Sequence, residues 1–332
     1  MTAGILHVVV SCKSRKTTEV PTRLRMSDVR SLGLRERACE WIDRLQTFPA
    51  ERIPASRLYA GDHWKVVLRI PEAAAGKLEI KLWVVSAGYG LVAIDTPLKP
   101  YSATFIRAHA EAIAPVASAY STSDWWHEVS QWQPEGHSEP RTLAQLAASL
   151  DSERDVLLLA LSEPYARALR DDIDAAELCA PGRVALVSVG LASAADEASP
   201  ESLLPVEARL KQIVGGAMQG VNARLAEKIV REHAAWFPRI DLLRGLVHQW
   251  VKEAPPLPTF DRALQTDDDV KRFIRERAQS GEGASKSAAL RALRDSGRAC
   301  EQARFGRLYR EVMGGSAAVA APQTGSQAGD SA

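Results

Sequence analysis

The feature that most constrains the fold is an apolar run, residues 81–85, that ends abruptly at Ser-Ala-Gly-Tyr-Gly, residues 86–90. A run this short, bounded by a glycine-rich turn, is typical of a buried strand. The glycines let the backbone turn sharply and let a ligand approach it closely. Asp95, Lys99 and Tyr101 follow within reach. Because ligands bind at the carboxyl ends of strands in parallel α/β sheets, we expect the chemistry here, and an ordinary polar loop is the alternative.

Three further apolar runs are typical of strands buried on both faces, at residues 5–10, 156–161 and 183–189. Helical patterns separate them. Four strands alternating with helices predict an α/β fold, with a doubly wound and mainly parallel sheet. Ser162 is expected to begin the helix after the third run, with Pro164 in its first turn, and Ser102 to cap a helix that runs from residue 103 towards 114.

The chain changes character after residue 204, where it becomes almost purely helical. A proline-rich stretch at 255–258 is typical of a linker, and the end of the chain is rich in Gly, Ala and Ser. We therefore predict a catalytic α/β domain over residues 1–200 and a helical extension over 201–254. A basic helical segment over 255–313 and a disordered tail over 314–332 would follow.

The overall charge is nearly balanced, since 42 Lys and Arg residues face 41 Asp and Glu, giving +1. The whole chain therefore indicates neither a nucleic-acid nor a membrane partner, and no run approaches the roughly 18 apolar residues of a membrane span. The 4 cysteines are widely scattered, with no His at ligand spacing, which argues against a metal site and a disulfide framework. With no secretory signal at the N-terminus, we expect a cytoplasmic protein.

Several common catalytic motifs are missing. The sequence has no Gly-x-Gly-x-x-Gly, no Gly-x-x-x-x-Gly-Lys-Ser/Thr, no zinc-deaminase signature and no Gly-x-Ser-x-Gly. Dinucleotide-binding, P-loop, zinc-deaminase and ordinary hydrolase functions all lose support, and no cofactor is predicted.

The first predicted strand runs into a small, hydroxyl-rich and basic turn, which consists of Ser11, Cys12, Lys13, Ser14, Arg15 and Lys16. Free backbone N–H groups and cations converge in such a turn, which makes it a candidate cradle for an anion or a polar ligand. A solvated basic loop is the alternative. Cys12 has no assignable His partner, so a packing role is favoured over a nucleophilic one.

The last helical segment is strongly basic, with eleven Lys or Arg residues between Asp268 and Met313. A helix, a Ser-Gly turn and a second helix resemble a helix-turn-helix, whose basic face could neutralise phosphates. A merely solvated helical hairpin is the alternative. The predicted nucleic-acid contacts of this segment are Lys286, Arg291, Arg294, Arg298 and Arg304.

Several short pieces occur in a fixed order: Ser-Cys-Lys-Ser-Arg-Lys at 11–16, Leu-Tyr-Ala-Gly at 58–61, and Ser-Ala-Gly-Tyr-Gly-Leu at 86–91, followed by Asp95 and Pro100-Tyr101. Over roughly residues 5–190, this order resembles a domain family similar to the core domain of archaeosine synthase, which acts on a deazaguanine base in tRNA, and to the uracil-DNA glycosylase-like superfamily. Two departures stand out. Gly88 replaces an expected Lys, and the first motif would ordinarily be Ser-Cys-Ser-Lys-Arg-Lys.

The resemblance implies a DNA glycosylase that excises a modified or unusual base, as relatives do in anti-phage defence. Such an enzyme extrudes the nucleotide and stabilises an oxocarbenium-like sugar while the base leaves. Asp95 is the candidate carboxylate, with Asp124 as the alternative. Tyr89 or Tyr59 would stack on the base, and the donors to base or phosphate would be Ser11, Lys13 and Ser86.

The other expected contacts lie at the same strand ends. Those to the base or ligand are Cys12, Gly88, Tyr101 and Ser162, while those to the nucleic-acid strand are Lys16, Asn222 and Arg224. Two alternatives stay open. One is an archaeosine-synthase-like transferase that alters a deazaguanine in tRNA or DNA without breaking the glycosidic bond. The other is a non-catalytic nucleic-acid-binding protein.

Overall fold

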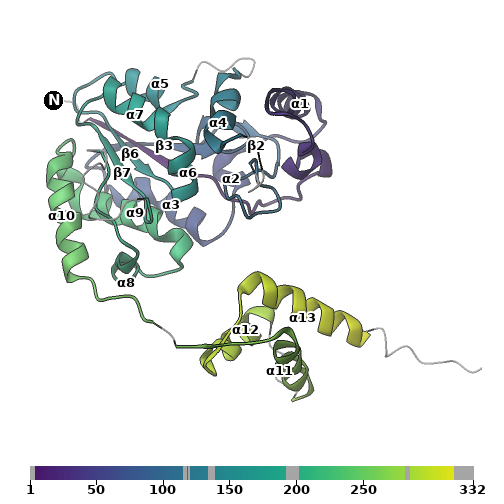
Figure 1. Cartoon of the computed structure of the whole chain (residues 1–332). Coiled ribbons are helices and arrows are strands. Elements are labelled where there is room, and N and C mark those ends of the chain that lie inside the picture. The colour runs from purple at the N-terminus through teal and green to yellow at the C-terminus, as the bar shows by residue number, and fades with distance from the viewer. Residues whose placement is uncertain are drawn as a thin grey trace, which may run out of the picture. The chain divides into compact units, whose positions relative to one another are not determined.

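The computed structural model describes residues 4–114, 118, 120–133, 139–191, 202–259, 261–280 and 285–317. The chain divides into two compact units, Met1–Leu257 and Pro258–Ala332, each of which is described by itself (Figure 1). The helices that follow residue 200 belong to the same unit as the sheet, and the division of the chain lies close to residue 255, where the basic helical segment was predicted to begin. Of the predicted tail, residues 314–317 end a helix and the rest lies outside the described residues.

A five-stranded sheet forms the centre of the first unit. Its order is β4-β3-β1-β6-β7, and all neighbours are parallel except β3 and β4. The strands are β1 (Ile5–Ser11), β3 (Glu79–Ser86), β4 (Gly90–Ala93), β6 (Val156–Ala160) and β7 (Val184–Val187). The predicted α/β class and mainly parallel sheet are confirmed.

Helices cover both faces of this sheet (Figure 1). On one face α3 (Asp62–Ala73) packs against α9 (Val221–His233), and both contact strands. The other face carries α4 (Thr122–Gln131), α5 (Leu143–Ala148), α6 (Glu163–Ala168) and α7 (Arg170–Cys179). Because both faces are covered, β6 is buried at every residue, as its uninterrupted apolar sequence predicts.

The remaining elements of the first unit connect these layers. Its other helices are α1 (Leu34–Thr47), α2 (Ala55–Leu58), α8 (Lys211–Val214) and α10 (Ile240–Glu253). Short 3-10 turns are η1 (Thr22–Leu24), η2 (Met26–Val29), η3 (Ala208–Leu210), η4 (Met218–Gly220) and η5 (Ala234–Trp236), and β2 (Ile53–Pro54) pairs with β5 (Pro97–Leu98). The helix predicted after Ser102 is wrong: Ser102 bridges to Arg25 and Thr104 to Ala112, so this segment pairs its backbone with other loops.

The chain reverses its direction across the sheet at β1. From β1 it crosses to β3 on one side and later to β6 on the other, so neighbouring crossovers diverge between β1 and β6. Open α/β sheets bind ligands beside the carboxyl ends of the two strands at such a point. We call this edge of the sheet, at the ends of β1 and β6, the crevice. The sequence motif at 11–16 begins at this point.

The second unit is a small helical domain with its own core. Its elements are β8 (Ala263–Leu264), α11 (Asp267–Gln279), α12 (Lys286–Asp295), β9 (Arg298–Ala299) and α13 (Gln302–Ala317). Val270 and Ile274 pack with Leu293, Phe305 and Leu308. Gly297, at φ +76°, follows the end of α12, so the predicted helix, turn and helix are present. Within the described part of both units, no helix has the length and apolar character that crossing a membrane requires.

The turn between β3 and β4 is packed tightly by aromatic rings. Trp125 Nε1 donates a hydrogen bond to the Ala87 carbonyl at 2.9 Å, and Trp41 Nε1 donates to the Gly88 carbonyl at 2.9 Å. A Cβ atom on Gly88 would lie 2.7 Å from two ring carbons of Tyr101, which is fully buried. The turn therefore has no space for the Lys that the resemblance predicts at this position.

Replacing Gly88 should destabilise the first unit. We expect Gly88→Ala to lower the free energy of unfolding by about 1–3 kcal/mol, because the new methyl group overpacks a rigid core. Gly245→Ala is the matched control: an added Cβ meets nothing within 4 Å on the exposed side of α10 and should raise stability by up to about 1 kcal/mol. Urea denaturation measures both, and equal effects would contradict the packing argument.

Candidate functional site

The site is built on the residue that ends β1. Ser11 Oγ accepts a hydrogen bond from the Ser162 backbone N–H at 3.0 Å, which ties the carboxyl end of β1 to the segment that follows β6. Ser162 begins α6 as predicted, but its side chain makes no capping bond. Two predicted ligand residues, Ser11 and Ser162, are therefore brought together at the crevice.

Cys12 lies inside the core, where it contacts the end of β3 and the helix α6. Its backbone N–H donates to the Val85 carbonyl at 3.0 Å, and its thiol lies 3.2 Å from the Tyr165 hydroxyl. The side chain is 5% exposed. This environment agrees with the packing role that the sequence favoured for Cys12.

Two lysines of the 11–16 loop lie over the crevice. Lys16 Nζ donates to the carbonyls of Lys13 at 2.6 Å and Ser14 at 3.3 Å, and it lies 4.5 Å from the ring centroid of Tyr101 and 4.9 Å from that of Tyr59. Burial lowers the pKa of Lys16 to about 8. Burial likewise lowers the pKa of Lys13, whose amine donates to the Gln219 carbonyl at 3.2 Å.

A chain of hydroxyl groups lies beneath these lysines. Ser86 Oγ accepts the backbone N–H groups of Gly88 and Tyr89, so its own proton is directed to Tyr101 Oη at 2.6 Å. Tyr101 Oη then lies 2.9 Å from Tyr59 Oη. Burial raises the pKa of both tyrosines well above the usual value, so both phenols stay neutral. Ser86 therefore stabilises the turn and sets the direction of the hydrogen bonds that run along these three hydroxyl groups.

The predicted stacking role of Tyr59 and Tyr89 is corrected by their packing. The two side chains are only 2% and 6% exposed. The Tyr89 ring packs against Tyr101 and Trp132, and its hydroxyl bonds the backbone of Lys99. In this conformation neither ring has a free face for a base.

The structure does not bring Asp95 to this group of residues. β4 runs antiparallel to β3, with Ser86 opposite Gly90 and Trp83 opposite Ala93. Ala93 is therefore already about 10 Å along β3 from Ser86, and Asp95 lies further on, exposed, at the other end of the strand. The prediction that Asp95 joins Ser86 and Tyr101 is wrong because the hairpin returns the chain to the amino end of β3. Asp124 completes the capping box of α4 with Ser121.

A histidine that the sequence interpretation missed lies at the crevice. His63 stands in the first turn of α3, is 8% exposed, and neither ring nitrogen has a hydrogen-bond partner within the described residues. A backbone group of Ser11 lies beside the ring without meeting hydrogen-bonding geometry. Burial, followed by the positive charge of Lys13, lowers the pKa of His63 to about 3. The imidazole is therefore neutral and carries one free donor and one free acceptor.

Asp62 precedes His63 and forms an ion pair with Arg224. The hydrogen bond from Arg224 holds the pKa of Asp62 below its usual range, so this carboxylate is ionised at neutral pH. Asn222 joins the ends of two strands: its side chain donates to the Leu161 carbonyl at 2.6 Å and accepts from the Val189 N–H at 3.0 Å. Arg224 and Asn222, predicted to bind nucleic acid, thus already have partners in the protein.

The basic residues of the second unit have unequal surroundings. Arg304 pairs with Asp267 at 2.6 Å, Arg294 donates to the Cys300 carbonyl at 3.2 Å, and Arg298 lies 5.0 Å from the ring centroid of Phe273. Lys286 and Arg291 are exposed on α12, and neither forms an ion pair with an acidic side chain in the described part of the chain. Of the five residues of this unit predicted to contact nucleic acid, these two are the exposed cations without an acidic partner among the described residues.

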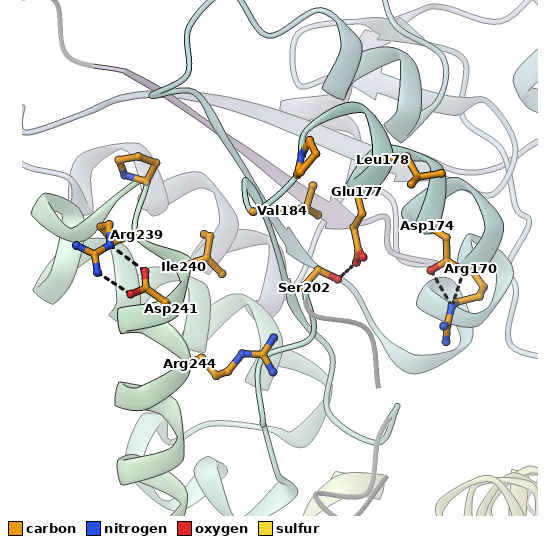
Figure 2. Close-up of a pocket in the computed structure, with 13 residues that line it drawn as sticks. Arg170, Asp174, Glu177, Leu178, Val184, Ser202, Arg239, Ile240, Asp241 and Arg244 are labelled. Carbon is orange, nitrogen blue, oxygen red and sulfur yellow. Dashed lines mark hydrogen bonds and ion pairs between the residues drawn. The ribbon is translucent and has the colours of Figure 1, made fainter. Parts of the chain in front are cut away.

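A cavity of about 1010 Å³ lies elsewhere in the first unit, between α7 and α10 (Figure 2). Arg170 pairs with Asp174 on one side of it and Arg239 pairs with Asp241 on the other. Its walls contain none of the predicted site residues. No cluster of three or more metal-ligating side chains occurs among the residues that the structure describes.

Comparison of the chain with protein-family models, with curated proteins and with solved structures gave no match.

The unpartnered state of His63 should be visible in the pH dependence of stability. A pKa of about 3 in the folded protein, against 6.5 in the unfolded chain, stabilises the protein fully above pH 6.5 and progressively less as the pH falls. Between pH 7 and pH 5, the wild type should lose about 2 kcal/mol more unfolding free energy than His63→Gln.

Denaturant titrations at the two pH values measure this difference. His248→Gln, at an exposed imidazole on α10, serves as the control and should keep the wild-type pH dependence. The same pH dependence in wild type and His63→Gln would show that His63 titrates alike in both states, contrary to its burial.

Proposed function

We propose that this protein is a DNA glycosylase that excises a modified or unusual base. One observation carries the proposal: a neutral imidazole, His63, has both ring nitrogens buried and unpartnered beside Ser11 and Lys13, where β1 and β6 end. Buried polar groups are nearly always hydrogen-bonded, and exceptions point to a bound ligand or a catalytic role. The edge of a nucleobase supplies the donors and acceptors that such a ring lacks.

The chemistry follows from the charge states of the site. As the bond between the sugar and the base breaks, the base leaves with the electron pair and gains negative charge. A neutral imidazole can donate a hydrogen bond to that charge, as a preorganised electrophile. The cations of Lys13 and Lys16 favour the same negative charge and the adjoining phosphates.

The sugar must be stabilised as it becomes positive. Asp62 precedes His63 in the first turn of α3 and is ionised because of its ion pair with Arg224. A carboxylate near the anomeric carbon stabilises the cation and orients the attacking water, as in glycoside hydrolysis. Asp62 therefore takes the role first expected of Asp95, and Arg224 would move towards a phosphate when DNA binds.

The resemblance of the 11–16, 58–61 and 86–91 motifs supports a uracil-DNA glycosylase-like fold and a place in anti-phage defence. Phage genomes that carry modified cytosines or guanines are accordingly the first substrates to test. The proposal includes DNA as the partner and requires no cofactor.

Mass spectrometry of the small molecules released from a panel of genomic and phage DNAs tests this function. We expect a free base in the presence of the wild type and at least ~100-fold slower release by His63→Gln, the scale of a lost electrostatic group. Asp95→Asn is the control, because its exposed carboxylate lies away from the site, and it should release base at the wild-type rate.

Other outcomes distinguish the alternatives. Full activity of His63→Gln, with an inactive Asp95→Asn, would contradict the assignment of the site. A heavier base that stays attached to DNA or tRNA would indicate the transferase, and binding of nucleic acid without any chemical change would indicate a non-catalytic binding protein.

We also propose that the second unit contacts DNA phosphates through the exposed cations of α12, Lys286 and Arg291. Lys286→Ala should weaken binding of a DNA duplex by the full-length protein and reduce the slope of log affinity against log salt by about 1, as for one lost phosphate contact. Arg272→Ala removes the same charge from an exposed Arg that already pairs with Asp269 at 2.9 Å, and should change the slope little. Fluorescence anisotropy at several salt concentrations measures both. Equal slopes for the two variants would contradict a contact at Lys286.

A further inference from the structure

Lys16 is a group at the crevice to which the glycosylase proposal assigns only an electrostatic role. Its amine donates to the carbonyls of Lys13 and Ser14 and lies over the rings of Tyr59 and Tyr101. The side chain is half-buried, and the bond to Ser14 lies on the exposed side of the loop. Among the described residues, no carboxylate forms an ion pair with this amine.

The hydrogen bonds define what this amine can do once it loses a proton. A neutral amine has two N–H groups and one lone pair. The two carbonyls of the loop accept the two N–H groups, which leaves the lone pair as the only unused position on the nitrogen. Burial lowers the pKa of Lys16 to about 8, so the neutral amine is populated near neutral pH. Lysines that react with carbonyl carbons are activated in the same way.

We propose that Lys16 is the nucleophile of a combined glycosylase and lyase reaction, in which its amine bonds covalently to C1′ of the target sugar. This inference rests on the proposed function and names the group that attacks. It extends that function from release of a base to cleavage of the DNA strand.

The steps balance without an oxidant or a reductant. Lys16 Nζ forms a bond to C1′ as the bond between C1′ and the base breaks, and the base leaves with the electron pair and takes up a proton. The amine loses a proton, and its nitrogen supplies the electron pair of a C=N bond to C1′. The bond between C1′ and the ring oxygen breaks, the oxygen keeps that electron pair and takes up a proton as the 4′ hydroxyl, and an imine joins Lys16 to the sugar. A proton then leaves C2′, the bond between C3′ and the 3′ phosphate oxygen breaks, and the phosphate leaves with that electron pair. Water hydrolyses the imine and returns the free amine.

The 11–16 loop provides a close internal comparison. Lys13 is a second amine of lowered pKa in the same loop, but its Nζ donates to the Gln219 carbonyl and lies over no ring for which a contact is described. If any nearby amine could react, adducts would form at both Lys13 and Lys16. If the reaction depends on the position of Lys16, the adduct should form at Lys16 alone of the two.

Borohydride trapping on a synthetic duplex with one abasic site tests the inference without knowledge of the base. The full-length wild type should form a stable adduct with the DNA, and peptide mapping should place the adduct on Lys16. Lys16→Arg keeps the charge and the donors but cannot form an imine, and should lower trapping at least ~100-fold. Lys252→Arg, at an exposed amine on α10 outside the site, should trap within about threefold of the wild type.

The two proposals fail in different ways. No adduct, or an adduct mapped to another amine in the wild type, overturns the role of Lys16, and this readout holds even if a variant fails to fold. If base is nevertheless released from the DNA panel, the glycosylase stands and water is its nucleophile. If the adduct forms at Lys16 but no DNA in the panel releases a base, the amine chemistry stands and the proposed base excision is contradicted.

Discussion

The hydrogen bond from the Ser162 N–H to Ser11 Oγ marks the constraint on which the site depends. It lies at the point in the sheet where the chain leaves β1 for β3 on one side and later enters β6 on the other. Asn222 fixes the adjoining edge by joining the ends of β6 and β7. These hydrogen bonds hold the strand ends in register. His63, Lys13 and Lys16 lie at the same edge of the sheet.

Burial sets the chemistry of that crevice. The imidazole of His63 and the amine of Lys16 both have lowered pKa values because burial disfavours their charged forms. Tyr59 and Tyr101 stay neutral for the same reason. The site therefore combines a neutral donor, a partly neutral amine and an ionised Asp62, which is a suitable set for cleaving a bond whose two sides acquire opposite charge.

The sequence was sufficient for the architecture and for part of the site. Uninterrupted apolar runs predicted the parallel strands, and the parallel arrangement brought Ser11 and Ser162 together as expected. The position of Asp95 could not be predicted, because it depends on the antiparallel pairing of β4 with β3 after the turn at Gly90, and no short sequence motif indicates that pairing. His63 was missed because a single histidine carries no spacing signal. Its significance is its burial without a partner, which only the packed structure reveals.

The most direct test of the central claim is the ¹⁵N NMR spectrum of the His63 ring between pH 8 and pH 5. We predict one protonated and one unprotonated nitrogen throughout, with no titration, as its lowered pKa requires. Protonation of both nitrogens with a midpoint near 6.5 would contradict the account, because it would show an imidazole solvated as in the unfolded chain and not one buried without a partner.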